Sequence, residues 1–234
     1  MATQKRLLRV TAVVLLMIVA LLAAGFGYLE SLPGVGDAQA RVRAILLAHH
    51  GVFSGPPPPA RLAAAVVAVE DEHFYSNFAV NVLDGAGRAA LATLHASGDP
   101  GGSTIAQQLA KQLYGQGSGL GATLHEIGLA VKLSLHFSKA TILSMYLNVI
   151  YYGNGYWGDE QAAHGYFRAS PYRLDWAQAA MLAGLPQAPT AYDPILHLVL
   201  AKERQRHVLD QLVATHVLTS RQANSAYHEA LLLR

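Results

Sequence analysis

The 234-residue sequence contains no cysteine, and only 14% of its residues are Asp, Glu, Lys or Arg. Without cysteine, the chain has no disulfide and no thiolate metal site. The low charge content and a net charge of +2 exclude a disordered chain and do not indicate a nucleic-acid partner. The eleven histidines are scattered, and no His-Glu-x-x-His spacing indicates a metal centre. Strand-period alternation is also missing over any useful length, so an all-α fold is predicted, with at most a small hairpin.

One long uncharged apolar run, residues 10–29, stands near the N-terminus, and Lys5, Arg6 and Arg9 precede it. A run of about 20 apolar residues suits a bilayer core. The basic residues predict a cytoplasmic segment over residues 1–9, a transmembrane anchor over 10–29 and an extracytoplasmic remainder. A cleaved signal peptide is the alternative, because Ala38-Gln39-Ala40 has the form of a cleavage site. That site lies far beyond the run, so a single-pass protein of the cytoplasmic membrane is favoured.

Residues 30–59 are interpreted as a linker and lead segment. A short stretch with Pro33, Gly34 and Gly36 is followed by a predicted helix over residues 38–50. Two glycines and four consecutive prolines then form a stiff connector over residues 51–59. The compact domain is therefore predicted to span residues 60–234.

A helix is predicted over residues 61–73, where an apolar run ends in carboxylates. Val66, Glu70 and Phe74 are four residues apart and share one stripe of this helix. Glu70 therefore lies on a face that is otherwise apolar. Loss of hydration there makes a carboxylate a better proton acceptor near neutral pH, as a general base requires. The alternative is that these acids form a solvated helix end.

The next predicted helix begins at Thr104, because Thr104-x-x-Gln107 fits a capping box. Thr104, Gln107, Gln108 and Lys111 are predicted to line one polar face. Hydroxyl, amide and ammonium groups at a glycine-flanked helix start suit a sugar or phosphate ligand. An ordinary amphipathic helix with a solvated polar face is the alternative.

Further helices are predicted over residues 86–96, 123–137, 140–149 and 161–167, and from 193 to 216. The second of these carries Glu126, a carboxylate on a mostly apolar helix that is either solvated or placed for function. Asp175-x-x-Gln178 and Thr219-x-x-Gln222 fit two more capping boxes, and Gly184 ends a helix. No chemistry is assigned to the residues after 194.

Several motifs follow one another in a fixed order. They are Glu70-Asp71-x-x-Phe74, Gly101-Gly102-Ser103-Thr104-Ile105-x-Gln107-Gln108-Leu109-x-Lys111, Glu126, Ser138-Lys139-x-x-Ile142-Leu143-x-x-Tyr146-Leu147-Asn148, and Leu182-Ala183-Gly184-Leu185-Pro186-Gln187-Ala188-Pro189. From about residue 60 to about 194, the chain resembles the peptidoglycan glycosyltransferase (family 51 transglycosylase) domain of penicillin-binding proteins. It contains no Ser-x-x-Lys acylation motif after this region, so it resembles the monofunctional, membrane-anchored form.

The resemblance implies a lysozyme-like, mostly helical domain and an inverting reaction. In that reaction lipid II is polymerised into glycan strands and undecaprenyl pyrophosphate is released. By matching position, Glu70 is the general base that takes the proton from the acceptor hydroxyl. Glu126 matches a second glutamate on the donor side, which acts with a divalent cation, most simply Mg²⁺.

The resemblance also implies the residues that bind substrate. Asp71 and Phe74 belong to the first motif, and Asp71 places a second negative charge beside the base. Lys111 offsets the charge that develops on the pyrophosphate, and the donor is also held by Ser103, Thr104, Gln107 and Gln108. The implied partners are lipid II, the growing glycan chain, the cytoplasmic membrane and other cell-wall synthesis proteins, with no nucleic acid.

The sequence departs from the family pattern at four places, and the last two of them remove cations. Asn77 and Ala79 replace a His and a Gly, and Ala106 replaces a Thr. The glycine-rich loop over residues 115–121 has no arginine, and Ala122-Thr123 stands where the family has Arg-Lys. A charge-assisted contact contributes about 1.5–3 kcal/mol, so this loss could lower activity.

Two other functions therefore stay open. A lipid II-binding or scaffold protein of the same machinery would keep the cleft without turnover. A lysozyme-type hydrolase would use the two carboxylates to cleave glycan.

Overall fold

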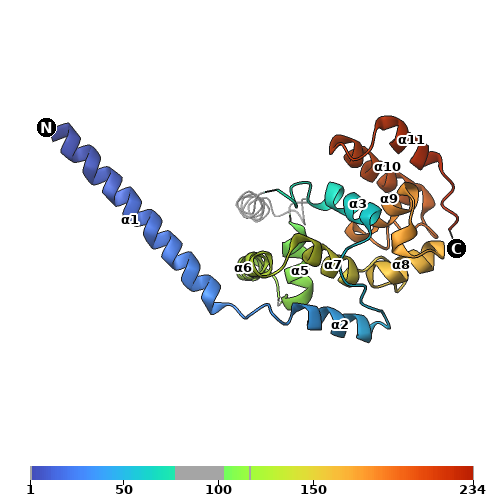
Figure 1. Cartoon of the computed structure of the whole chain (residues 1–234), viewed down its shortest axis with the longest axis horizontal. Coiled ribbons are helices and arrows are strands. Elements are labelled where there is room, and N and C mark those ends of the chain that lie inside the picture. Colours follow the sequence, from blue (N-terminus) through green and yellow to red (C-terminus); the bar gives the residue numbers. More distant parts are fainter. Residues whose placement is uncertain (1, 77–102, 116, 234) are drawn as a thin grey trace. The chain divides into compact units, whose positions relative to one another are not determined.

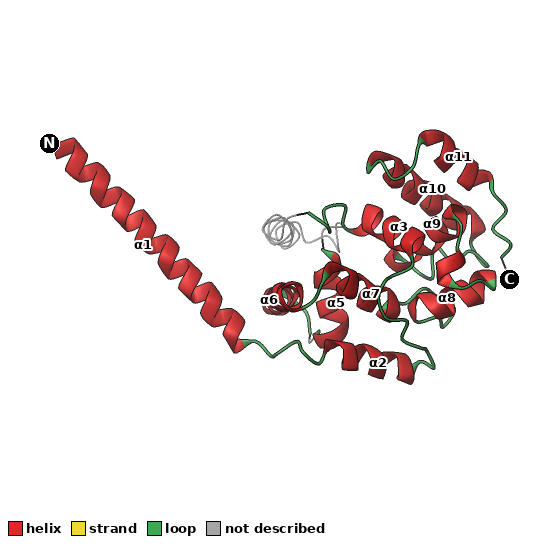
Figure 2. Cartoon of the chain, viewed as in Figure 1, coloured by secondary structure: helices red, strands yellow, loops and turns green. Residues whose placement is uncertain are grey.

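The computed structural model describes residues 2–76, 103–115 and 117–233. These residues form helices and loops, with no strand in the described ranges (Figures 1 and 2). The all-α prediction, which allowed at most a small hairpin, is confirmed: the described residues contain one isolated bridge, between Tyr151 and Trp157. The chain divides into two compact units, Met1–Gly34 and Val35–Arg234.

The first unit is helix α1, Ala2–Ser31. Its apolar part, Arg9–Ser31, has 23 residues and a mean hydropathy of 2.6, and none of it is buried within the protein. By length and composition this helix can cross a membrane. The predicted apolar helix over residues 10–29 is confirmed, whereas its orientation across a membrane stays a prediction.

The second unit begins before the predicted domain start at residue 60. Helix α2, Ala38–Ala48, buries Ala38, Val42 and Leu46 and contacts helices α5 and α7. The connector after it is also held, because the backbone N–H of Ser54 donates to Asn148 Oδ1 over 3.0 Å. Residues 35–59 therefore belong to the domain and do not act as a free linker.

Helices α5, Ile105–Tyr114, α6, Leu120–His136, and α7, Lys139–Val149, contact one another. Both halves of the predicted capping box at Thr104 are present, so the helix start is confirmed. Ser138 caps α7 through its side chain, which accepts a hydrogen bond from the Thr141 N–H. Helix α7 is the most buried element of this group, since every residue from Ile142 to Val149 is buried.

Helices α3, Ala60–Glu70, α9, Trp176–Gly184, and α10, Leu198–Ala214, form a second group of mutual contacts. Helix α11, Ser220–His228, packs on α9 and α10. The capping boxes predicted at Asp175 and Thr219 are both present. The remaining elements are α8, Gly158–Phe167, and the 3-10 helices η1, Pro171–Arg173, and η2, Leu185–Gln187.

Several predicted helix boundaries were wrong. Helix α6 begins at Leu120 instead of residue 123, and helix α8 begins at Gly158 instead of residue 161. Helix α3 ends at Glu70 instead of residue 73, because Asp71 is extended (φ −159°, ψ 76°) and its carboxylate accepts from the Ile105 N–H. Helix α10 begins at Leu198 instead of residue 193, because the buried Asp193 side chain instead accepts from the Ile195 N–H and from Asn154 Nδ2. The helix predicted over residues 86–96 lies outside the described residues.

Candidate active site

Glu70 is the last residue of α3 and lies on the wall of a cavity of about 570 Å³, the Glu70 cavity. Its side chain is only 15% exposed, as the apolar stripe predicted. The described residues that line the cavity come from α3, α5, η2 and α10 and the segments beside them. They are Val69, Glu70, Ser103, Gln108, Pro186, Gln187, Ala188, Tyr192, Arg204 and His207.

Two side chains hold the Glu70 carboxylate from different helices. From α5, Gln108 Nε2 donates to Glu70 Oε2 over 2.9 Å. From α10, a guanidinium nitrogen of Arg204 lies 3.9 Å from Glu70 Oε1. The amide thus holds one carboxylate oxygen by a hydrogen bond, and the guanidinium faces the other. The Glu70 carboxylate therefore joins the group of α5, α6 and α7 to the group of α3, α9 and α10.

Arg204 lines the Glu70 cavity and was not predicted, because the sequence pattern after residue 194 indicates no chemistry. Its side chain is only 11% exposed. Burial lowers the pKa of the Arg204 guanidinium, and the Glu70 charge opposes that shift. The sequence contains a signal for this contact at Gly184, a position that also predicts a helix end. A Cβ at Gly184 would lie 2.7 Å from Arg204 Cγ, so glycine is what lets the arginine stem pass.

His207 and Tyr192 also line the cavity and were not predicted. His207 lies one turn after Arg204 on α10. Burial and the neighbouring Arg204 lower the pKa of His207, whereas Asp210 opposes this shift. Neutral imidazole is therefore favoured near neutral pH, and it can both donate and accept hydrogen bonds in the cavity.

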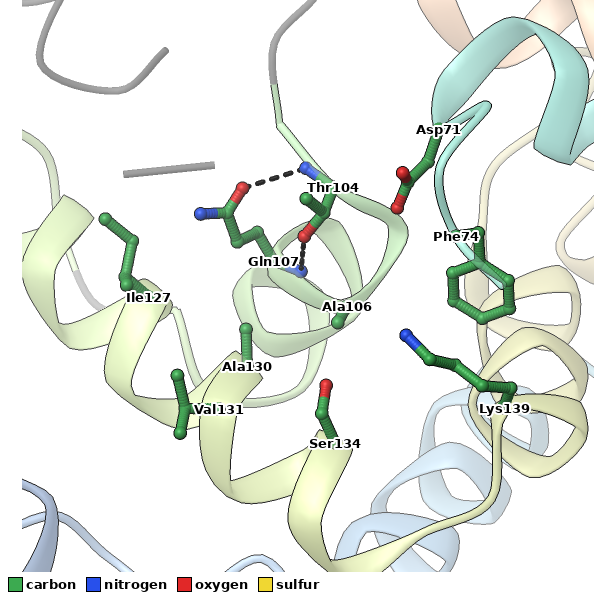
Figure 3. Close-up of a pocket in the computed structure, with 10 residues that line it drawn as sticks. All are labelled: Asp71, Phe74, Thr104, Ala106, Gln107, Ile127, Ala130, Val131, Ser134 and Lys139. Atoms are coloured by element: carbon green, nitrogen blue, oxygen red, sulfur yellow. Dashed lines mark hydrogen bonds between the residues drawn. The ribbon is translucent and has the colours of Figure 1, made fainter. Parts of the chain in front are cut away.

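The carboxylate of Asp71 lies beside a second, smaller cavity of about 20 Å³, the Asp71 cavity (Figure 3). Figure 3 shows three groups that converge at this cavity. The Asp71 carboxylate and the Phe74 ring come from the turn after α3, and the Lys139 ammonium comes from the start of α7. Lys139 Nζ lies 4.7 Å from the centre of the Phe74 ring, which is fully buried. Burial lowers the pKa of Lys139, and the charge of Asp71 opposes that shift. This cavity is about the size of one water molecule.

The polar residues predicted on α5 do not share one face. Thr104 and Gln107 line the Asp71 cavity, where the Thr104 hydroxyl and the Gln107 amide oxygen are engaged in the capping box (Figure 3). Ser103 and Gln108 line the Glu70 cavity. Lys111 is exposed and lines neither cavity. Consecutive helix residues point about 100° apart, which is why Gln107 and Gln108 separate.

Glu126 lies half-buried on α6 and lines neither of the two cavities. Among the described residues, no group of three or more His, Asp or Glu side chains could hold a metal ion. The described residues alone therefore do not form a site for the implied divalent cation. The departures at residues 77 and 79 lie outside the described residues.

Fold and site together define an all-α domain with a carboxylate-centred cleft, on a chain whose apolar N-terminal helix can cross a membrane. Residues 54–213, more than half of the chain, match the family model described as "Transglycosylase". The chain belongs to this family, as its motifs predicted.

Known relatives agree with that membership. The chain is 40% identical over 169 residues to penicillin-binding protein 1A of Neisseria gonorrhoeae, covering 71% of this chain and 21% of that protein. It is also 40% identical over 163 residues to penicillin-binding protein 2a of Streptococcus pneumoniae serotype 2, covering 69% and 22%. The chain thus spans about a fifth of these relatives. A crystal structure of penicillin-binding protein 1A from Haemophilus influenzae aligns at 25% identity and a TM-score of 0.39, covering 56% of this chain and 16% of that one.

Proposed function

We propose that this protein is a peptidoglycan glycosyltransferase that polymerises lipid II and releases undecaprenyl pyrophosphate. The observation that carries the proposal is the mostly buried Glu70 carboxylate, held by Gln108 and Arg204 on the wall of an open cavity. The transglycosylase match over residues 54–213 supports the reaction class. The apolar helix α1 fits a lipid-linked substrate, because it would keep the domain at a membrane, on the extracytoplasmic side by the positive-inside rule.

In the proposed mechanism, Glu70 takes the proton from the acceptor's sugar hydroxyl. The hydroxyl oxygen attacks the donor's anomeric carbon, and the bond to the lipid pyrophosphate breaks with inversion. Gln108 keeps one carboxylate oxygen in place, which leaves the carboxylate oriented for proton transfer. Arg204 lies where it can offset negative charge in the cavity.

Arg204 supplies a positive charge to the Glu70 cavity, whereas residues 115–123 lack the basic residues of the family pattern. The predicted donor-side cation, Lys111, is exposed and lines neither cavity. Arg204 comes instead from α10, and Lys139 from the start of α7 beside the Asp71 cavity. Lys139 belongs to the motif that carries the resemblance, so it is not a replacement. We infer that Arg204 replaces some of the cations missing from residues 115–123.

The role of a metal ion stays a prediction. Mg²⁺ is usually bound by one or two carboxylates together with substrate phosphates, so Glu126 would need the pyrophosphate to complete its coordination. The described residues do not form a metal site by themselves. No step is therefore assigned to a metal ion.

A lipid II-binding protein without turnover is the second candidate. The observation that favours it is the exposed position of Lys111. Among the described residues that line the Glu70 cavity, Arg204 is the only Lys or Arg. The hydrolase alternative has less support. Glycoside hydrolysis uses two carboxyl groups, and Glu70 is the only carboxylate among the described residues that line the Glu70 cavity.

The deciding experiment compares glycan polymerisation from lipid II in detergent with Mg²⁺, using the intact chain and Glu70→Gln. Glu72→Gln is the matched control, because Glu72 is two residues away and its side chain is 51% exposed. Polymer from the parent and from Glu72→Gln, but not from Glu70→Gln, is the expected result. Lipid II binding without polymer from any of the three would favour the second candidate, and full activity of Glu70→Gln would refute the base.

A further inference from the structure

Behind Glu70 lies a chain of two hydrogen bonds that ends at a buried tyrosine. Tyr146 on α7 is 0% exposed, and its hydroxyl donates to Gln108 Oε1 over 2.8 Å. The other end of the same amide, Gln108 Nε2, donates to Glu70 Oε2 over 2.9 Å. Tyr146 therefore reaches the carboxylate through a single side chain and does not line the Glu70 cavity itself.

The orientation of the Gln108 amide decides whether Glu70 has a donor. An ionised carboxylate only accepts hydrogen bonds, so the amide must present its NH₂ group to Glu70. With the amide turned over, its oxygen would face the carboxylate and repel it. Gln108 Nε2 also lies 3.4 Å from the Ser103 carbonyl oxygen, another acceptor, and this contact favours the same orientation.

The Tyr146 hydroxyl selects this orientation from the opposite side. It is buried, and an unsatisfied buried hydroxyl is costly. Burial raises the pKa of Tyr146 well above its ordinary value, and the charge of Glu70 adds to the shift, so the hydroxyl keeps its proton across the working pH range. Gln108 Oε1 is the acceptor of this hydroxyl proton among the described residues. Turning the amide over would leave the buried proton without that acceptor, so the oxygen faces Tyr146 and the NH₂ group faces Glu70.

We propose that Tyr146 is a positioning residue for glycosyl transfer, which holds the Gln108 amide so that its NH₂ group orients the Glu70 carboxylate. The inference rests on the proposed function, since it assigns a means of orienting the base of that reaction. It differs from a packing role. A packing role requires only the Tyr146 ring, whereas positioning requires the hydroxyl.

Tyr146→Phe keeps the ring and removes the donor. The Gln108 amide can then rotate, and Glu70 loses its hydrogen bond in a fraction of the molecules. We expect kcat for lipid II polymerisation to fall about tenfold, with KM changed less than twofold. The acid limb of the pH–rate profile should move upward, because a hydrogen bond to the ionised carboxylate favours that form.

Other groups around Glu70 can also affect this profile. Among the described residues they are Arg204 and His207 on α10, Tyr192 before α10, the adjacent Asp71, and Tyr152, which also interacts electrostatically with Glu70. Gln108→Ala separates their effects from that of Tyr146, because it removes the amide and leaves them in place. It should produce the same upward move of the acid limb as Tyr146→Phe.

The experiment measures kcat, KM and the pH–rate profile of the parent, Tyr146→Phe, Gln108→Ala and the double variant. In the Gln108→Ala background, Tyr146→Phe should cost less than twofold, because its effect passes through the amide. Tyr152→Phe is the matched control: Tyr152 is equally buried, and its hydroxyl has no hydrogen-bond partner among the described residues. Burial raises the pKa of Tyr152 well above its ordinary value, so its hydroxyl is neutral and Tyr152→Phe removes no charge from the surroundings of Glu70. The pH profile of this control should therefore equal that of the parent.

Each outcome has a definite meaning. Additive losses in the double variant, or an unshifted profile for Tyr146→Phe or Gln108→Ala, would overturn the positioning role while leaving the proposed function standing. No polymer from the parent chain would refute the proposed function, and the inference with it. If Tyr146→Phe does not fold, the profile of Gln108→Ala still decides, since a shift supports the amide's role and its absence refutes it.

Discussion

Glu70 and Asp71 are adjacent in the sequence, yet their carboxylates line different cavities. Glu70 ends α3 and is held by Gln108 and Arg204 beside a space of about 570 Å³. Asp71 leaves the helix, binds the N–H of Ile105 and lines a space of about 20 Å³. One acid therefore borders a cavity that can admit a substrate, and the other joins the end of α3 to the start of α5. The difference shows that adjacent motif residues can perform separate tasks.

The largest expected effect concerns the activities of these two acids. Glu70→Gln should lower lipid II polymerisation by about 10²- to 10⁴-fold, because it removes the proton acceptor. Asp71→Asn keeps an oxygen for the Ile105 N–H, so we expect a loss at least tenfold smaller. Initial polymerisation rates, with circular dichroism to check folding, test the pair. Equal losses would mean that both carboxylates act on the substrate and that the division between the cavities has no functional meaning.

The second prediction concerns the cation that faces Glu70 from α10. Arg204→Gln should lower polymerisation by roughly 10- to 100-fold, because a buried charged group on the cavity wall is lost. Arg206→Gln is the control, since Arg206 lies two residues along the same helix and its guanidinium packs 3.6 Å from the centre of the Tyr227 ring. Comparable activity of the two variants in the same assay would argue against a role for Arg204 in the Glu70 cavity.

A third prediction concerns Asp159, a buried acid that lies in neither cavity. Burial, with a further contribution from Glu160, raises the pKa of Asp159 to about 7 from its ordinary 3.8. The folded chain therefore holds one more proton than the unfolded chain between these two pH values, so stability falls as the pH rises through this window. Asn does not titrate, so Asp159→Asn should not show this decrease in stability with rising pH.

Thermal unfolding from pH 5 to pH 8 tests this expectation. The melting temperature of Asp159→Asn relative to the parent should rise with pH, on the order of 5 °C between the two limits. Glu229→Gln is the control, because Glu229 is exposed after the end of α11. A constant difference between Asp159→Asn and the parent across the range would contradict the prediction.

The smallest effect concerns the structural task of Asp71. Asp71→Ala leaves the Ile105 N–H at the start of α5 without this acceptor, so the free energy of unfolding should fall by about 1–2 kcal/mol. Glu72→Ala should change it by less than about 0.5 kcal/mol, because the Glu72 side chain is 51% exposed and its contact with His73 lies at the surface. Denaturant unfolding measures the free energy of unfolding of both variants. An unchanged midpoint for Asp71→Ala would contradict a structural role for Asp71.

Local sequence signals predicted most of the fold. The capping boxes at Thr104, Asp175 and Thr219 each use side chains within four residues, so their geometry needs no distant partner. The prediction failed where a distant group intervened. At Asp71 the helix ends because the carboxylate binds a backbone N–H that is 34 residues away.

The candidate site could be predicted only in part, for the same reason. Glu70, Ser103 and Gln108 were predicted from their motifs and lie together on the wall of one cavity. Arg204 and His207 lie more than 130 residues from Glu70 in the chain, on a helix whose pattern showed no chemistry. Only the packing of α10 against α3 and α9 brings them to the cavity.

The sequence by itself determined the helical fold class, the apolar N-terminal helix, the family and the position of Glu70 on a face that becomes buried. Each of these follows from periodicity, capping or an ordered set of motifs, which are properties of neighbouring residues. The tertiary structure decided which groups face Glu70, how the polar residues of α5 divide between two cavities, and that Tyr146 lies behind Gln108. These depend on distances between helices far apart in the chain, and such distances are set by the packing of the whole domain.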